Sequence, residues 1–202
     1  MTNISKDFYA AVEGRRTYYG LSKESDVSDQ RIEEIIAHAL KHTPSQFNTQ
    51  AQRIVVLLGE NHTELWDIAT ETLRKIVPAD NFAPTEERMK GFSSGYGTVL
   101  FFEDMEVIES FQKQLPTFAD NFPVWAQQSN GMLQYVVWTA LEIEGFGASL
   151  QHYNPLIDDE VKGKWNIPSK WNLIAQMPFG KPSAAPGEKQ YQPIENRIKV
   201  FK

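Results

Sequence analysis

The sequence predicts a mixed fold of α-helices and β-strands, because short apolar runs alternate with amphipathic stretches along its 202 residues. Three runs have the length and apolar character of buried strands, at 54–58, 97–103 and 171–179. Apolar residues recur with helical spacing before and between them, for example over 29–40. A hydrophobic content of 41%, with 12% aromatic residues, is enough for a packed core. We therefore expect a single folded domain over 1–202.

The other helices are predicted from the same periodicity and from local start and stop signals. Asn61, followed three residues later by a glutamate, predicts a capped start for a helix over 62–77, which Pro78 ends. The most apolar helix is expected over 128–144, with Gly145 as its C-terminal stop. It is apolar on nearly all sides, so it should be central or shared with a second subunit. Shorter helices are expected at 5–13, 106–115 and 158–165.

Two long segments have the composition of loops. Residues 79–97 contain three glycines and a proline, and they predict a mobile, partly helical excursion of the kind that forms lids or binding loops. Residues 180–202 contain three prolines and end with Ile194, Ile198 and Phe201 at helix-like spacing. This last segment predicts a C-terminal extension that forms a short helix or clasps a partner subunit.

Charge and composition exclude several classes of function. The formal net charge is −6, which argues against nucleic-acid binding, since a phosphate backbone requires a basic face. The absence of cysteine excludes disulfides, thiolate catalysis and Cys-ligated metals, and it fits a reducing, cytoplasmic location. No signal-peptide pattern opens the chain, and no apolar run reaches the roughly 18 residues of a membrane helix.

The segment 43–53, with sequence TPSQFNTQAQR, is a polar connection between a predicted helix and a predicted strand. Its amide side chains carry both a donor and an acceptor, so they match a flat ligand edge such as an imide or a uracil-like ring. They do not titrate, which makes them poor acid–base catalysts. An ordinary polar loop is the alternative interpretation.

Two adjacent cations followed by a hydroxyl, Arg15, Arg16 and Thr17, come directly after the first predicted helix. Guanidinium groups can bind a phosphate through paired hydrogen bonds, so this cluster is a candidate phosphate site. A solvated basic turn is the alternative.

Motifs for other chemistries are missing from the sequence. It contains no HExxH, no P-loop and no GxGxxG after a strand, and its histidines form no triad-like grouping. His38 and His42 share a helix face, but no acidic ligand lies near them in the sequence. The sequence therefore predicts no metal site and no catalytic side chain of these types.

Taken together and in order, these pieces resemble the nitroreductase-like FMN flavoproteins, and most of all the branch of fatty-acid-repression and copper-induced nitroreductases. The resemblance extends over about 15–201 and rests on the segments RRTYY, TPSQFNTQAQR, GYGTVLFFED, GASLQHYNP, FGKP and EKQYQPIENRIKVF. Each segment alone is weakly specific, whereas their order and spacing are specific together.

This resemblance implies an α+β fold with a central antiparallel sheet flanked by helices, in an intertwined homodimer with FMN at two interface sites. It also implies an oxidoreductase that takes electrons from NADH or NADPH and reduces nitroaromatic or quinone-like acceptors by a ping-pong route. The flavin carries the redox chemistry, so no side chain has to act as a nucleophile. The tail at 180–202 would pack on the partner subunit.

The family's FMN-binding positions transfer to four groups of residues. Those expected near the ribityl phosphate and the pyrimidine edge are Arg15, Arg16 and Thr17. Those expected from the other subunit are Pro44, Ser45, Gln46, Asn48 and Gln50. Those expected to line the flavin ring are Leu150, Gln151 and His152. The candidates for a phosphate-holding cation are Lys189 and Lys181.

Two questions stay open at this point. One group of aromatic side chains has either of two roles, as the roof of the flavin pocket or as plain core and dimer packing: Phe92, Tyr96, Phe118, Phe122 and Trp125. The resemblance also allows a regulatory or stress-response flavin-binding protein in which reductase turnover is incidental.

Overall fold

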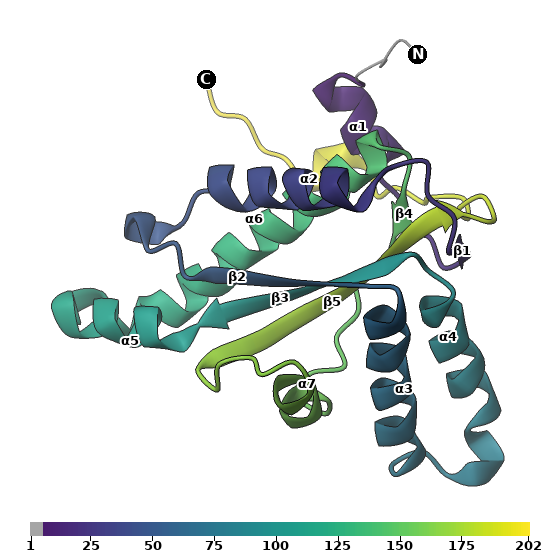
Figure 1. Ribbon diagram of the computed structural model, residues 1–202. Helices are drawn as coiled ribbons and strands as arrows, with labels where there is room; N and C mark the ends of the chain where they lie inside the picture. Colours follow the sequence, from purple (N-terminus) through teal and green to yellow (C-terminus); the bar gives the residue numbers. More distant parts are fainter. Residues whose placement is uncertain (1–5) are drawn as a thin grey trace.

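The computed structural model describes residues 6–202, and its centre is an antiparallel β-sheet with helices on both faces (Figure 1). The strands are β1 (Leu21–Ser22), β2 (Gln52–Leu58), β3 (Gly97–Asp104), β4 (Gly147–Ala148) and β5 (Trp171–Pro182). Their order is β1-β5-β3-β2, and β4 also pairs with β5. All pairings between these strands are antiparallel, which confirms the predicted α+β class.

The helices form two layers on the faces of this sheet. They are α1 (Phe8–Gly14), α2 (Asp29–His42), α3 (Glu60–Arg74), α4 (Ala83–Ser93), α5 (Met105–Gln114), α6 (Phe122–Ile143) and α7 (Asp158–Lys164). Figure 1 shows α2 and α6 on one face, and α3, α4 and α7 on the other. Short 3-10 helices occur at Gln46–Asn48, Ala79–Asn81, Pro116–Asn121 and Ile194–Asn196.

Strand β3 supplies side chains to both layers, because successive residues of a strand point to opposite faces. Val99 and Phe101 pack into the cluster formed with α2 and α6. Leu100 and Phe102 pack into the cluster formed with α3, α4 and α7. All four side chains are fully buried. A strand covered on both faces reads as a continuous apolar run, which is why the sequence made β3 easy to identify.

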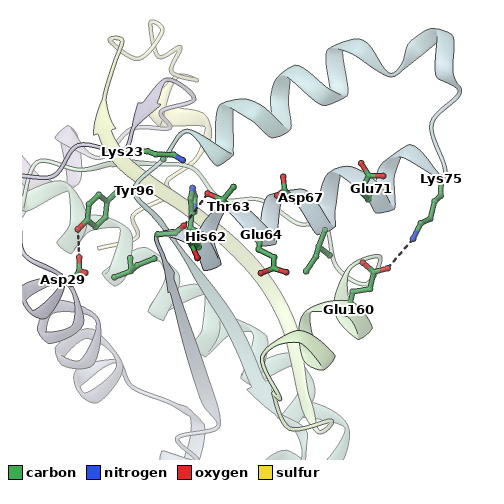
Figure 2. A pocket seen from close by; sticks show the side chains of 15 residues that line it. Lys23, Asp29, His62, Thr63, Glu64, Asp67, Glu71, Lys75, Tyr96 and Glu160 are labelled. Atoms are coloured by element: carbon green, nitrogen blue, oxygen red, sulfur yellow. Dashed lines mark hydrogen bonds and ion pairs between the residues drawn. The ribbon is translucent and has the colours of Figure 1, made fainter.

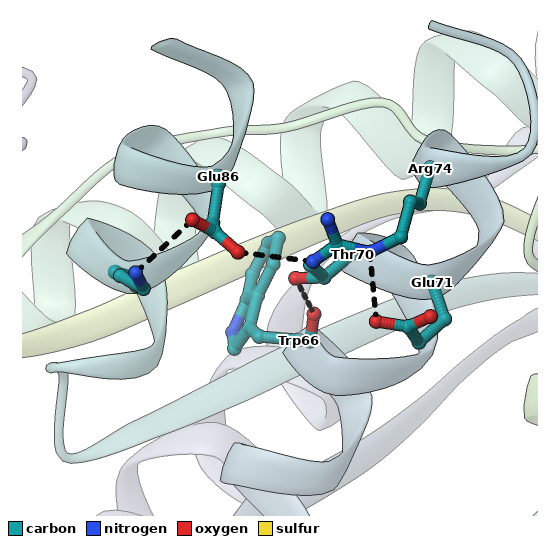
Figure 3. A network of polar contacts seen from close by, with 6 residues as sticks. Trp66, Thr70, Glu71, Arg74 and Glu86 are labelled. Atoms are coloured by element: carbon teal, nitrogen blue, oxygen red, sulfur yellow. Dashed lines mark hydrogen bonds and ion pairs between the residues drawn. The ribbon is translucent and has the colours of Figure 1, made fainter. Parts of the chain in front are cut away.

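Helices α3 and α4 pack together as a hairpin beside the sheet (Figure 1). The buried Trp66 and Phe92 rings lie 4.8 Å apart between them. Arg74 bridges the pair at the surface, donating to Glu71 at 3.2 Å and to Glu86 at 2.9 Å (Figure 3). Helix α4 occupies most of the segment that was predicted as a mobile, partly helical excursion, because its apolar side chains close the core under α3.

The predicted capping box at the start of the third helix was wrong. Helix α3 begins at Glu60, directly after Gly59, whose φ of 57° turns the chain out of β2 without a side-chain cap. The Asn61 side chain instead accepts a hydrogen bond from Trp165 Nε1 at 2.9 Å. The Asn61 side chain therefore makes a long-range contact with Trp165 in place of the predicted cap of its own helix.

Other element boundaries differ from the prediction by a few residues. The first helix begins at Phe8 with Asp7 as its cap, and the predicted start at Ser5 lies outside the described residues. Helix α6 begins at Phe122 rather than at 128, because Pro123 is compatible with a first turn. In the part of the chain that is described, no helix is long and apolar enough to cross a membrane. The cytoplasmic location stays a prediction.

Candidate functional site

The loop at 44–50 crosses α6 with a strained backbone. Phe47, Asn48 and Gln50 have φ values of 48°, 54° and 48°, a region that residues other than glycine rarely adopt. Such conformations persist only where the surrounding structure holds them, and they concentrate at functional sites. The strain therefore supports a functional role for this loop over an ordinary polar connection.

The side chains of this loop leave polar groups available to a ligand. Gln46 Oε1 accepts from Ser129 Oγ at 2.7 Å, while its buried Nε2 has no hydrogen-bond partner among residues 6–202. The Ser45 hydroxyl accepts from the Gln50 backbone N–H at 2.9 Å. Asn48 is exposed. A buried amide donor without a partner is costly, so Gln46 Nε2 marks a place for an acceptor atom.

An aromatic group surrounds the tip of the loop. Phe47 is half exposed, and its ring lies 5.7–6.0 Å from those of Phe118, Phe122 and Trp125. A cleft of about 340 Å³ lies beside this group, lined by Gln46, Phe47, Trp125, Gln128, Ser129 and Met132. The predicted pocket aromatics Phe118 and Trp125 thus lie at the loop.

Of the other predicted roof aromatics, Phe122 packs beside the same loop, whereas Phe92 and Tyr96 have packing contacts elsewhere. Phe92 and Phe122 are fully buried in the core, although Phe92 also lines a cleft described below. The Tyr96 hydroxyl donates to Asp29.

The Arg15 guanidinium lies on the aromatic surface of α6. Its central carbon is 4.5 Å from the centre of the Trp138 ring and 5.8 Å from that of Tyr135. Its Nε is buried and has no hydrogen-bond partner in the described chain. Arg16 donates to the Gly187 carbonyl. Stacking fixes one face of the Arg15 group and leaves donors for an anion.

The segment after α6 lies between this cation pair and the sheet. Thr17 forms a parallel bridge with Ala148 of β4. Gln151 exchanges two backbone hydrogen bonds with Gln176, at 2.7 and 2.9 Å. Leu150 packs against the core, and His152 is exposed. The structure therefore brings the predicted ring-lining loop close to the first motif.

A cleft of about 670 Å³ opens between Gln151 and α4. It is lined by Tyr19, Pro84, Glu87, Arg88, Gly91, Phe92 and Gln151. Arg88 is exposed and takes part in no hydrogen bond or ion pair within residues 6–202. The sequence did not identify this cation, because α4 was expected to be a mobile excursion.

The two candidate tail cations have different surroundings. Lys181 Nζ lies 3.0 Å from Asp26 Oδ2 and 3.9 Å from Glu24 Oε2, so carboxylates already compensate its charge. Lys189 is exposed, with Nζ 5.2 Å from the Tyr191 ring. The Arg16 contact with Gly187 places the Lys189 segment near the first motif. Lys189 is therefore the better candidate for a phosphate cation.

Within a single chain, the arginine motif and the amide loop lie apart along α6. Gln46 contacts Ser129 and Arg15 packs on Trp138, which is nine residues further along α6. At 1.5 Å of rise per residue these positions are roughly 14 Å apart along the helix. Apolar side chains of α6 that are 39–55% exposed are Val124, Met132, Tyr135, Val136 and Ile143. This exposed apolar face leaves open the prediction that the helix is central or shared with a second subunit.

A cleft of greater volume lies elsewhere, along α3 (Figure 2). It has a volume of about 910 Å³ and contains none of the predicted FMN-binding residues. Two lysines, Lys23 and Lys75, line this cleft. They are outnumbered by carboxylates, which are those of Asp29, Glu60, Glu64, Asp67, Glu71 and Glu160. Such a field disfavours a phosphate-bearing ligand.

Two buried side chains have pKa values that differ from the ordinary ones. Burial raises the pKa of Glu103 to about 7, against the lowering effect of a hydrogen bond from Asn130 Nδ2 at 2.9 Å. Burial lowers the pKa of His62 to about 4, and its Nδ1 is 2.8 Å from Thr98 Oγ1. Both groups lie in the core, so they bear on stability.

The described residues contain no group of three or more potential metal-ligating side chains. The His38 and His42 rings lie 4.4 Å apart on α2, without an acidic ligand to complete a site.

Comparisons with known proteins bear on the family and the fold of this chain. Residues 12–181 match the model of the nitroreductase family. HBN1 of Saccharomyces cerevisiae is 36% identical over 196 residues, which cover 96% of each chain. The nitroreductase FRM2 of the same yeast is 34% identical over 201 residues, which cover 96% of this chain and 97% of FRM2. The nitroreductase CinD from Lactococcus lactis, solved in complex with chloramphenicol, is 39% identical with a TM-score of 0.88, over 97% of this chain and 100% of CinD.

Proposed function

The chain belongs to the nitroreductase family, and from this premise we propose that it is an FMN-dependent oxidoreductase that uses NADH or NADPH to reduce nitroaromatic or quinone-like acceptors. Family membership supports an oxidoreductase of the nitroreductase type. The cofactor, the electron donor, the ping-pong order and the homodimer are our proposal. The observation that carries it is the pair of buried, unpartnered donors at Arg15 and Gln46 in the described chain.

The residues at both motifs fit FMN. The phosphate and the ring oxygens of FMN are acceptors, and Arg15 Nε and Gln46 Nε2 are buried donors without partners among residues 6–202. Lys189 would hold the phosphate, and Arg15 and Arg16 would lie near the phosphate and the pyrimidine edge, where a guanidinium group stabilises negative charge on the reduced ring. The amides of Gln46 and Asn48 would pair with the pyrimidine edge. When bound, FMN supplies the hydride chemistry.

The proposed site needs two copies of the chain. Arg15 and the loop at 44–50 are separated along α6, and the exposed apolar side chains of α6 lie between and around them. In a two-fold dimer the same patch is used by both copies, so packing α6 against its equivalent would bring the loop of one chain to the arginines of the other. The extension at 180–202, which exposes Tyr191, Ile194, Ile198, Val200 and Phe201, would pack on the partner.

The cleft between Gln151 and α4 is the proposed binding place for the electron donor and the acceptor. Because Gln151 would lie against the flavin ring, either molecule in the cleft would be next to that ring, and the two would occupy it in turn. CinD has been solved with 4-nitrophenol as well as with chloramphenicol, and both molecules carry a nitroaromatic group. We extend that acceptor class to this chain.

A reductive titration tests the proposed function. The purified protein should be yellow, should be bleached by NADPH or NADH without oxygen, and should recolour with 4-nitroquinoline N-oxide. A yellow protein that neither nicotinamide bleaches would instead support the regulatory alternative. A colourless protein that does not bind added FMN would contradict both.

A further inference from the structure

Arg53, the first charged residue of β2, contacts the strained loop directly. Its Nη1 donates to the Gln50 carbonyl at 2.7 Å and to the Gln52 carbonyl at 3.0 Å. Gln50 is one of the loop residues with positive φ. The guanidinium therefore binds the carbonyl at the end of the strained stretch, where the loop enters the sheet.

Asp104 holds this guanidinium from the neighbouring strand. Its Oδ2 lies 2.9 Å from Arg53 Nη2, and its Oδ1 accepts from the Glu106 backbone N–H at the start of α5. The Asp104 backbone N–H donates to the Ala51 carbonyl at 2.9 Å. The side chains of Arg53 and Asp104 are 28% and 13% exposed, so water screens this pair less than a surface pair. The Trp171 ring lies 5.7 Å from the guanidinium carbon.

These contacts connect the loop to the rigid sheet. Among the described residues, another side-chain hydrogen bond from the loop to the rest of the chain is that between Gln46 and Ser129, whereas the one between Ser45 and the Gln50 N–H lies within the loop. A backbone with three non-glycine residues at positive φ tends to relax when an anchor is removed. Loss of the Arg53 contact would free Gln50 first.

We propose that Arg53, oriented by Asp104, is a positioning residue that holds the loop at 44–50 in the conformation that presents its amides to the pyrimidine edge of FMN. The proposal rests on the proposed FMN site and assigns a role to two residues that do not touch the ligand. Arg53 acts through Gln50, and Asp104 acts through Arg53.

Two variants test this role. Arg53→Met keeps much of the aliphatic side chain and removes the donors, whereas Asp104→Asn removes the charge and keeps an amide oxygen able to cap α5. We expect each to weaken FMN binding about tenfold, as loss of a partly exposed charge-assisted hydrogen bond predicts. The assay is titration of the apoprotein with FMN, followed by flavin fluorescence.

Arg74→Met is the matched control. Arg74 contacts two carboxylates, where Arg53 contacts one carboxylate and two backbone carbonyls, and it likewise lies near an aromatic ring, at 4.3 Å from that of Phe82. It joins α3 to α4 away from the loop (Figure 3). It should leave FMN affinity unchanged. Thermal unfolding of all three apoproteins then separates a general loss of stability from a loss of positioning.

A second flavin gives a readout that a merely structural role would not change. The unaltered protein should bind N3-methyl FMN more weakly than FMN, because the methyl group blocks the edge that the amides recognise. Arg53→Met and Asp104→Asn should lose most of this preference, and Arg74→Met should keep it. If both loop-side variants bind FMN like the unaltered protein, or keep the full preference for FMN, the positioning role is wrong. If the unaltered protein does not bind FMN at all, the proposed function itself fails.

Discussion

Replacing Glu103 by glutamine should change how the stability of the protein depends on pH. Glu103 is buried, its Oε1 accepts from Asn130, and its Oε2 has no partner within residues 6–202. Burial raises the pKa of its carboxyl group from the ordinary 4.5 to about 7. The folded protein therefore keeps a proton on Glu103 over a pH range in which the unfolded chain has released it.

The sign and size of the effect follow from proton linkage. The contribution of Glu103 to the free energy of unfolding is fully present below pH 4.5. It declines as the pH rises to about 7, because folding requires Glu103 to take up a proton in this window. At 1.36 kcal/mol for each pKa unit, the loss between these limits is about 3 kcal/mol. The amide introduced by Glu103→Gln would not titrate, and its oxygen could still accept from Asn130.

Urea unfolding of the apoprotein at fixed protein concentration is the assay, from pH 4.5 to pH 8. His62 contributes a slope of the opposite sign, since its pKa is lowered to about 4 and its contribution is lost as the pH falls from 6.5. Subtracting the free energy of unfolding of the unaltered protein from that of Glu103→Gln cancels the His62 contribution, which both proteins share. That difference should shift in favour of the variant by about 3 kcal/mol towards pH 8. A difference that does not vary with pH would refute a buried, protonated Glu103.

Three further predictions follow. Arg15→Ala should lower FMN affinity about tenfold or more, measured by flavin retained after gel filtration, and unchanged retention would contradict the phosphate assignment. Val136→Glu places a charge on the exposed apolar face of α6 and should shift the protein to monomers in sedimentation velocity, whereas Leu156→Glu, also exposed but away from α6, should not. A Cβ at Gly180 would lie 2.5 Å from the Ser22 carbonyl oxygen, so Gly180→Ala should destabilise by about 1–3 kcal/mol in urea unfolding. Gly163→Ala, with open space on α7, should instead be neutral or stabilising, and equal losses in the two variants would contradict this packing.

Much of the fold was predictable because burial leaves a clear pattern in the sequence. The run at 97–103 reads as a strand since both faces of β3 are covered, and α2 reads as a helix since Ile32, Ile36 and Ala39 repeat on its buried face. The two-residue strands β1 and β4 were not predictable, because they exist only through pairing with distant β5.

The candidate site was predictable in its residues and not in its geometry. The sequence identified Gln46 and Arg15, but it carries no sign that three residues of the loop have positive φ or that Arg15 stacks on Trp138. Arg53 ends the segment TPSQFNTQAQR and lies outside the predicted strand at 54–58, whereas β2 includes it. The available signal was a cation directly after an amide-rich loop, together with an aspartate directly after the next predicted strand.

Complementation between two defective variants tests the central claim of a site shared by two chains. One variant carries Arg15→Ala and Arg16→Ala, and the other carries Gln46→Ala and Asn48→Ala. Each homodimer should be free of flavin. After the two are mixed, unfolded and refolded together, half of the dimers should be mixed, each with one intact site, so about a quarter of the chains should retain FMN. No recovery of flavin, with mixed dimers present, would contradict the account.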